Sequence, residues 1–174
     1  MKRTGISILL LSTIMLFSSG CVSEPGIDKN KFADLIRTAR DLQASITTDK
    51  PCDVSEVLLQ KLVSRTAALK DKKASKAESD VLAACSRLLT TYHDGLLLCK
   101  HRTHLNQFEF VPKGRIYVTQ ELDPLVAKYD LPTERHVYKP TGVHWRSVAW
   151  DSINVIRESA EKQTKNIENM VNYD

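Results

Sequence analysis

The chain has 174 residues, of which 42% are apolar and 26% are charged, and its formal net charge is +4. This composition is ordinary for a globular protein and excludes a fibrous repeat or a wholly disordered chain. Because Lys2 and Arg3 belong to a segment that we expect to be removed, the remaining chain carries only about +2, which argues against a nucleic-acid partner.

The first twenty residues have the pattern of a secretory signal peptide. Lys2 and Arg3 form a positive start, and residues 6–17 form an apolar run that is too short to cross a bilayer as a stable helix. We therefore expect residues 1–20 to direct export and to be cleaved. The rest of the sequence has no second apolar run of about 18 residues or more, so membrane attachment is expected only through the N-terminus.

Small residues lead up to a cysteine directly after this run, in Ser18-Ser19-Gly20-Cys21. The segment resembles the lipobox of bacterial lipoproteins, in which the cysteine thiol receives a diacylglycerol and signal peptidase II cleaves before it. The resemblance implies that Cys21 is the lipidated N-terminus, that residues 21–30 form a tether, and that the protein is anchored in the lipid bilayer. Val22 stands where Asp would indicate inner-membrane retention, so the resemblance implies an outer-membrane protein that faces the periplasm.

A second kind of cleavage also fits this segment. Ser18 stands where Leu is commonest in a lipobox, and Ser18 and Gly20 satisfy the preference of ordinary signal peptidase for small residues at alternate positions. That enzyme would cleave the same bond and leave Cys21 without lipid. The number of free thiols distinguishes the two outcomes.

Residues 31–174 are predicted to form one mainly α domain. Apolar residues recur at helical spacing in four long segments, at about residues 31–48, 54–69, 75–101 and 143–169. The short connections between the first three favour an antiparallel helical bundle of about four main helices. The stripe of the first helix is Phe32, Leu35, Ile36, Ala39, Leu42 and Ile46.

The second helix is expected to start from Asp53 as N-cap, with Glu56 completing a capping box. Its inward face is predicted to include Val54, Val57 and Leu62.

The pattern changes between the third and the last of these helices. Two extended segments, 108–111 and 116–119, flank a turn that contains Pro112 and Gly114, which predicts a short extended or β-hairpin elaboration near 107–119. A short helix is expected over residues 123–129 and an ordered loop over 131–143.

Three cysteines remain as disulfide candidates if Cys21 carries lipid: Cys52, Cys85 and Cys99. In one helix Cys85 and Cys99 are separated by about 21 Å along the axis, so they cannot pair with each other. Folding the second and third helices back on each other places Cys52 between these two partners. Because Cys52 precedes its helix and the chain there continues towards Cys99, the sequence favours Cys52–Cys99 over Cys52–Cys85 and leaves Cys85 as a buried thiol.

The sequence carries no HExxH, GxSxG, SxxK, Walker A or CxxCH motif, so we predict neither an enzyme nor a bound cofactor. His101 and His104 have a spacing that can chelate a metal on a helix, but the adjacent Lys100 and Arg102 repel a cation, and no metal site is predicted. The candidate ligand-binding residues are two histidines and two tryptophans that would line a pocket beside the last helix, for which core packing is the alternative role: His136, His144, Trp145 and Trp150.

The expected function is that of a lipid-anchored, non-enzymatic binding or structural module of the cell envelope, with an envelope protein as its partner. One version is an assembly factor similar to secretion pilotins, some of which are small lipoproteins with a disulfide in a helical domain; this rests on analogy between classes. The alternative is a small-ligand or metal-binding lipoprotein that uses residues 136–150.

Overall fold

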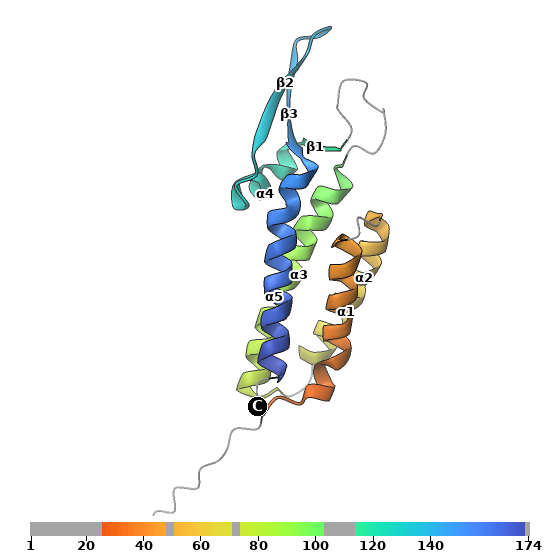
Figure 1. Ribbon diagram of the computed structural model, residues 1–174, viewed down its shortest axis with the longest axis vertical. Helices are drawn as coiled ribbons and strands as arrows, with labels where there is room; N and C mark the ends of the chain where they lie inside the picture. The colour runs from red at the N-terminus through yellow and green to blue at the C-terminus, as the bar shows by residue number, and fades with distance from the viewer. Residues whose placement is uncertain (1–25, 48–50, 71–73, 103–113, 173–174) are drawn as a thin grey trace, which may run out of the picture.

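The computed structural model describes residues 26–47, 51–70, 74–102 and 114–172. Within these residues the protein is mainly helical, with a small three-stranded antiparallel sheet at one end (Figure 1). None of the helices in the described ranges is long and apolar enough for a membrane crossing. The elements are α1 (Lys29–Thr47), α2 (Cys52–Lys70), α3 (Lys76–Lys100), β1 (Arg115–Val118), η1 (Gln120–Leu122), α4 (Asp123–Lys128), β2 (Thr133–Tyr138), β3 (Val143–Ala149), η2 (Trp150–Ile153) and α5 (Asn154–Asn172).

The four long helices pack around the larger hydrophobic core. α1 lies against α2 and α5, and α3 lies against the same two helices. The stripe predicted for the first helix is confirmed, because Phe32, Leu35, Ala39 and Leu42 recur every three or four residues and are at most 2% exposed. Burial of a Phe or Leu side chain contributes about 1.5 to 3 kcal/mol, so this stripe holds α1 against the other helices.

The inward face predicted for α2 is only partly right, because Leu62 and Leu69 are buried as expected but the first turns face another way. Val54 and Val57 are exposed, whereas Ser55 and Leu59 are buried. The buried Ser55 hydroxyl has a partner, since its Oγ lies 3.0 Å from Ser45 Oγ on α1. Apolar residues surround much of α2, so periodicity alone does not fix its rotation, and the contacts with α1 and α3 do.

A disulfide joins the start of α2 to the end of α3. Cys52 and Cys99 are bonded, with their Cα atoms 6.0 Å apart, and this is the pairing that the sequence favoured. α2 begins at Cys52 itself, so Asp53 lies in the first turn and is not the N-cap. The carboxylate of Glu56, predicted to complete the capping box, instead accepts a hydrogen bond of 2.7 Å from Lys100 Nζ beside the disulfide.

Cys85 is a free thiol that lies buried in the larger core, as the pairing of Cys52 with Cys99 requires. Burial raises the pKa of this thiol to about 11, because apolar surroundings disfavour the charged thiolate.

The start of α3 is held by a capping box and by a contact with α1. Ser75 Oγ accepts a hydrogen bond from the Glu78 amide, and Glu78 Oε2 accepts one from the Ser75 amide. Lys31 Nζ donates to the same carboxylate oxygen over 2.6 Å, and this bond is the main cause that lowers the pKa of Glu78. The start of α1 therefore lies beside the start of α3.

Two strands of the sheet stand where the sequence predicted other structure. β2 occupies part of the predicted loop over 131–143, and β3 occupies the predicted beginning of the last helix, which starts at Asn154 instead. Trp145 and Val148 fit a helical stripe as well as a strand, so their spacing did not decide between the two. Gly142 closes the turn between β2 and β3: its φ is +69°, a value that favours glycine, and its amide donates to Tyr138 O over 2.8 Å.

The sheet has the order β1-β3-β2, with β3 antiparallel to both neighbours. The predicted hairpin near 107–119 is only partly present, because β1 pairs with β3; the segment 108–111 lies outside the described residues. A second, smaller core joins the sheet and α4 to the end of α3 and the start of α5, and it consists of Leu98, Ile116, Val118, Leu122, Leu125, Leu131, Val148, Ile153 and Ile156.

A buried carboxylate fastens α4 to α3. Asp94 is 7% exposed, and its Oδ2 accepts hydrogen bonds from Lys128 Nζ over 2.6 Å and from the Tyr129 hydroxyl over 2.8 Å. The paired ammonium and hydroxyl compensate the cost of burying this charge. The sheet end of the molecule is therefore fixed on the long helices by polar as well as apolar contacts.

Candidate binding site on the sheet

The four candidate residues from the sequence do not share one surface. His136 lies on β2, His144 and Trp145 lie on β3, and Trp150 lies in η2. Alternate residues of a strand point to opposite faces of a sheet, and the register pairs His136 with Trp145 across the strands. His136 and Trp145 therefore share one face of the sheet, and His144 points to the other.

The first face carries an aromatic cluster around Trp145, which is only 6% exposed. The His136 ring stacks on the indole, with ring centroids 4.0 Å apart and an angle of 18° between the ring planes. The Tyr117 ring lies 6.0 Å from the indole on the other neighbouring strand. These contacts are typical of cross-strand aromatic pairs that stabilise a sheet.

A serine and a histidine lie within hydrogen-bonding distance beneath this cluster. His136 Nε2 is 2.8 Å from Ser147 Oγ, which also accepts a hydrogen bond of 2.7 Å from Arg115 Nε. Arg115 in turn pairs with Glu134 over 2.7 Å. Ser147 has no exposed surface, and a nucleophile needs access to its substrate. This geometry favours a structural role for the pair, which orients the His136 ring against Trp145.

A basic hollow is lined by Val118, Arg135, His144 and Arg146 of the opposite face, and Tyr117 and Trp145 also border it. Val118, Arg146 and Arg135 form one row across β1, β3 and β2, because Arg146 is the register partner of both neighbours. His144 lies in the next row of the same face. Arg135 and His144 are both exposed.

The two arginines of the basic hollow differ in their partners. Arg146 forms an ion pair with Asp123 at the start of α4. Arg135 makes no ion pair with any residue in the part of the chain that the structure describes. Because Asp123 pairs with Arg146, the positive charge left at this pair of opposed arginines is that of Arg135, and a carboxylate or another anion would neutralise it.

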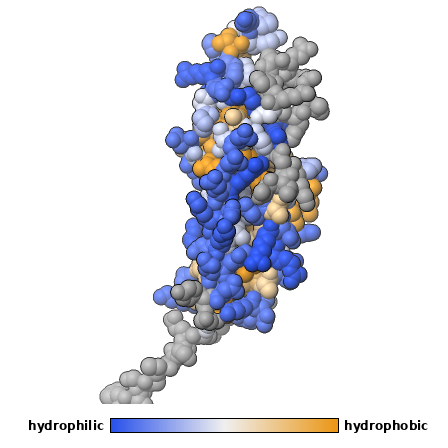
Figure 2. All heavy atoms as spheres, viewed as in Figure 1, coloured by the Kyte–Doolittle hydropathy of each residue, from blue (hydrophilic) through white to orange (hydrophobic). Residues whose placement is uncertain are grey.

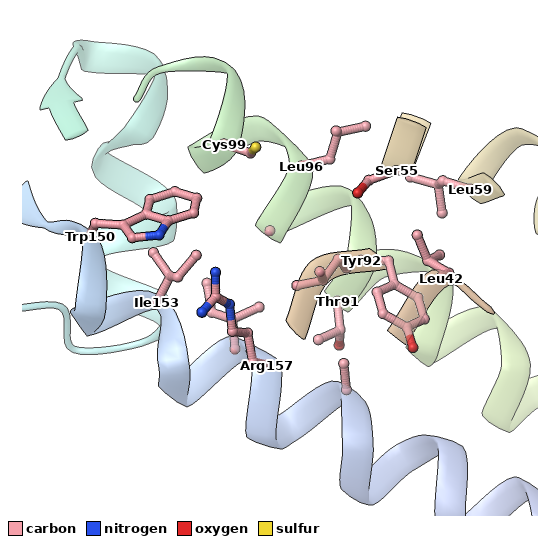
Figure 3. A pocket seen from close by; sticks show the side chains of 14 residues that line it. Leu42, Ser55, Leu59, Thr91, Tyr92, Leu96, Cys99, Trp150, Ile153 and Arg157 are labelled. Carbon is pink, nitrogen blue, oxygen red and sulfur yellow. The ribbon is translucent and has the colours of Figure 1, made fainter. Parts of the chain in front are cut away.

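Trp150 belongs to a separate apolar pocket between the long helices (Figure 3). Figure 3 shows Trp150 and Ile153 on one side of this pocket and Leu42 and Leu59 on the other. The guanidinium carbons of Arg102 and Arg157 lie 4.0 and 5.3 Å from the centroid of the Trp150 ring. Cations over an indole at such distances are attracted to its face, so Trp150 is held in place by charge as well as by packing.

The apolar pocket is small. Its volume is about 40 Å³, the space of a few water molecules, whereas pockets for drug-sized ligands have volumes of about 300 to 1,000 Å³. Tyr92, on its wall, has its hydroxyl within 3.3 Å of Ala39 O and donates to Gln43 Oε1 over 3.0 Å. Burial raises the pKa of Tyr92 to about 12. The pocket therefore fits a packing defect of the core better than a ligand site.

Sequence reasoning identified part of this region and missed the rest. It named His136, His144 and Trp145, but not the arginines Arg135 and Arg146. The missing signal was strand alternation, because only a strand places Arg146 and His144 on one face and Trp145 on the other. No group of three or more His, Cys, Asp or Glu side chains in the described ranges is placed to hold a metal ion.

Comparison with known proteins finds no matching protein family, no similar curated protein and no similar solved structure.

Proposed function

We propose that the chain is a lipid-anchored, non-enzymatic binding module of the cell envelope that presents its sheet to a protein partner. The signal-like residues 1–20 and the lipobox-like segment that ends at Cys21 support the anchor and the compartment. By the same resemblance, the protein is attached to the outer membrane and faces the periplasm.

The observation that carries the proposal is the position of the sheet relative to the start of α1. α1 begins beside the start of α3, through Lys31 and Glu78, whereas the sheet lies at the other end of α3, where Arg102 bridges to Ile116 (Figure 1). The 25 residues of α3 span about 37 Å. A chain anchored at Cys21 would therefore hold its sheet well away from its own membrane.

The long helices suit the role of a spacer. We propose that α1, α2, α3 and α5 act as an antiparallel four-helix bundle, which the Cys52–Cys99 disulfide keeps closed at the sheet end. On the face seen in Figure 2 hydrophilic residues cover most of the helical part, with some hydrophobic residues among them, and a group of hydrophobic residues is also exposed near the end of the hairpin that points away from the helices. The exposed apolar side chains of this hairpin are Val137 and Val143. Other exposed valines lie on α2 and at the start of α5, so the preference for the sheet rests on its distance from the anchor.

A small-ligand-binding lipoprotein is the second candidate, and the apolar pocket beside Trp150 is the observation that favours it. Its volume of about 40 Å³ limits a ligand to a very small apolar molecule. Native mass spectrometry of the purified chain distinguishes the two functions: a bound small molecule that survives purification would support the second candidate.

Two measurements test the proposed function. The intact mass of the chain extracted from membranes should show cleavage after Gly20 and added acyl chains, and Cys21→Ser should move the protein into the soluble fraction. Chemical cross-linking in cells at native expression should then capture an envelope protein reproducibly. A chain that carries no lipid would contradict the anchor, and a chain that captures no protein would contradict the binding role.

A further inference from the structure

We propose that β2 and Arg135 form a docking site for an extended acidic segment of a protein partner, which adds to the sheet as a fourth strand. The inference rests on the proposed function, since it names the surface and the chemistry by which the binding module recognises its partner.

One edge of the sheet is closed and the other is open within the described residues. At the outer edge of β1, the Tyr117 amide donates to His101 O over 3.3 Å, and Arg102 bridges to Ile116. β2 is the other outer strand, and among the described strands it pairs only with β3. An edge strand presents unpaired N–H and C=O groups, and an extended peptide can use these groups to join the sheet.

The positive charge of Arg135 at this edge favours an acidic segment as the added strand. A residue of an added antiparallel strand directly opposite Arg135 would have its Cβ about 4.5 to 5.5 Å from that of Arg135. A carboxylate there pairs with the Arg135 guanidinium and offsets its repulsion with Arg146, whose own carboxylate partner is Asp123. A guanidinium matches a carboxylate in shape and can bind both oxygens.

The exposed Val137 predicts an apolar residue in the added strand. It lies two residues after Arg135 on the same face of the sheet, and it is 52% exposed. An apolar side chain opposite Val137 would cover this surface, so the added strand should carry a carboxylate and an apolar residue two positions apart. A single occupant then accounts for the exposed Val137 and for Arg135, which has no ion-pair partner among the described residues.

Two other occupants are disfavoured. In a second copy, antiparallel pairing centred on Arg135 would place that residue opposite itself, which like charge opposes. An anionic lipid headgroup of the anchoring membrane would have to reach the far end of α3, about 37 Å along that helix from the end beside which α1 begins. A protein segment from the surrounding compartment meets neither obstacle.

Site-specific photo-cross-linking in cells tests the proposal. A photoreactive amino acid replaces Val137 in the full chain, and in a matched chain it replaces Val57, which is equally exposed at 52% but lies on α2. The position 137 probe should cross-link to one protein, and mass spectrometry should place the link in a segment with an acidic and an apolar residue two positions apart. Adding Arg135→Glu should lower the yield at least about tenfold, the loss expected for one charge-assisted contact.

Arg87→Glu is the matched control, because Arg87 is an exposed arginine on α3, outside the sheet, and the yield at position 137 should not change. A synthetic peptide of the linked segment should bind the full chain, and replacing its acidic residue by Lys should weaken binding to the original chain and restore it to the Arg135→Glu chain. This exchange of charges would not occur if Arg135 had only a structural role.

Other results would overturn the proposal: a link from position 137 to phospholipid, to a second copy of this chain or to nothing, or a linked segment without an acidic residue. If position 57 captures a protein and position 137 does not, the binding function stands and this site fails. If neither position captures a protein, both fail.

Discussion

Removal of the Cys52–Cys99 disulfide should destabilise the protein strongly. Cys52 and Cys99 are separated by 47 residues, and loop closure over this length gives an entropy of about 14 cal/mol/K, or about 4 kcal/mol at 25 °C, in the chain-entropy treatment. A domain of this size loses about 3 °C in Tm per kcal/mol. The variant Cys52→Ser/Cys99→Ser should therefore unfold about 12 °C below the original chain.

Thermal and urea unfolding of the purified chain, followed by circular dichroism with and without reductant, measure this loss. Reductant should lower the Tm of the original chain and leave that of the double variant unchanged. Cys85→Ala is the control, because Cys85 is outside the bridge, so this variant should keep its response to reductant. The Glu56–Lys100 ion pair is partly exposed and contributes at most about 1 kcal/mol, so it cannot mask the effect. A decrease in Tm of less than about 3 °C in the double variant would refute the reasoning. A Tm of the double variant that still changes with reductant would refute it as well.

Glu78→Gln should make the free energy of unfolding depend less on pH in the acid range. The hydrogen bond from Lys31 lowers the pKa of Glu78 in the folded chain. The stabilisation by ionised Glu78 is therefore complete above the pKa of the unfolded chain and is lost as pH falls through the pKa of the folded chain. Gly142→Ala should cost about 1 to 2 kcal/mol, because φ is +69° at Gly142 and a side chain is strained there. Gly95→Ala should have the opposite sign and stabilise α3 by up to about 1 kcal/mol, since the added Cβ would lie 3.6 Å from Ile156 Cγ2, an ordinary contact. Cys85 should resist iodoacetamide at pH 8 until denaturant is added, because its thiol is buried and its pKa is raised to about 11.

Each of these outcomes has a measurement that can contradict it. For Glu78, urea unfolding between about pH 3 and 7 should show the original chain more stable than the Glu78→Gln chain near neutral pH, with the difference shrinking towards the acid end; parallel curves would exclude the linkage. For the glycines, equal losses at Gly142 and Gly95 would mean that backbone φ does not decide the effect. For Cys85, rapid alkylation of the folded chain would show that the thiol is accessible.

Local sequence patterns predicted the long helices because the information is contained in neighbouring residues. Phe32, Leu35, Ala39 and Leu42 fall on one side of a helix whatever lies opposite them. The rise of a helix excluded a bond between Cys85 and Cys99 and left Cys52 to pair with either one; the structure has the favoured pairing with Cys99, although Cys52 lies in α2 and not before it. The rotation of α2 was not predictable in this way, because Val54 and Val57 are as apolar as Leu59.

The sheet and its candidate site depended on contacts between distant parts of the chain. Trp145 and Val148 satisfy both a helical and an extended pattern, and only pairing of β3 with β1 and β2 selects the strand. The same register places Arg135 opposite Arg146 and separates His144 from Trp145. By itself the sequence determined that the protein is mainly helical, where the first three long helices lie and that Cys85 and Cys99 do not pair, because these follow from local geometry. The tertiary structure decided which strand pairs with which, and so which charges share a face, because strand partners are set by packing across the whole fold.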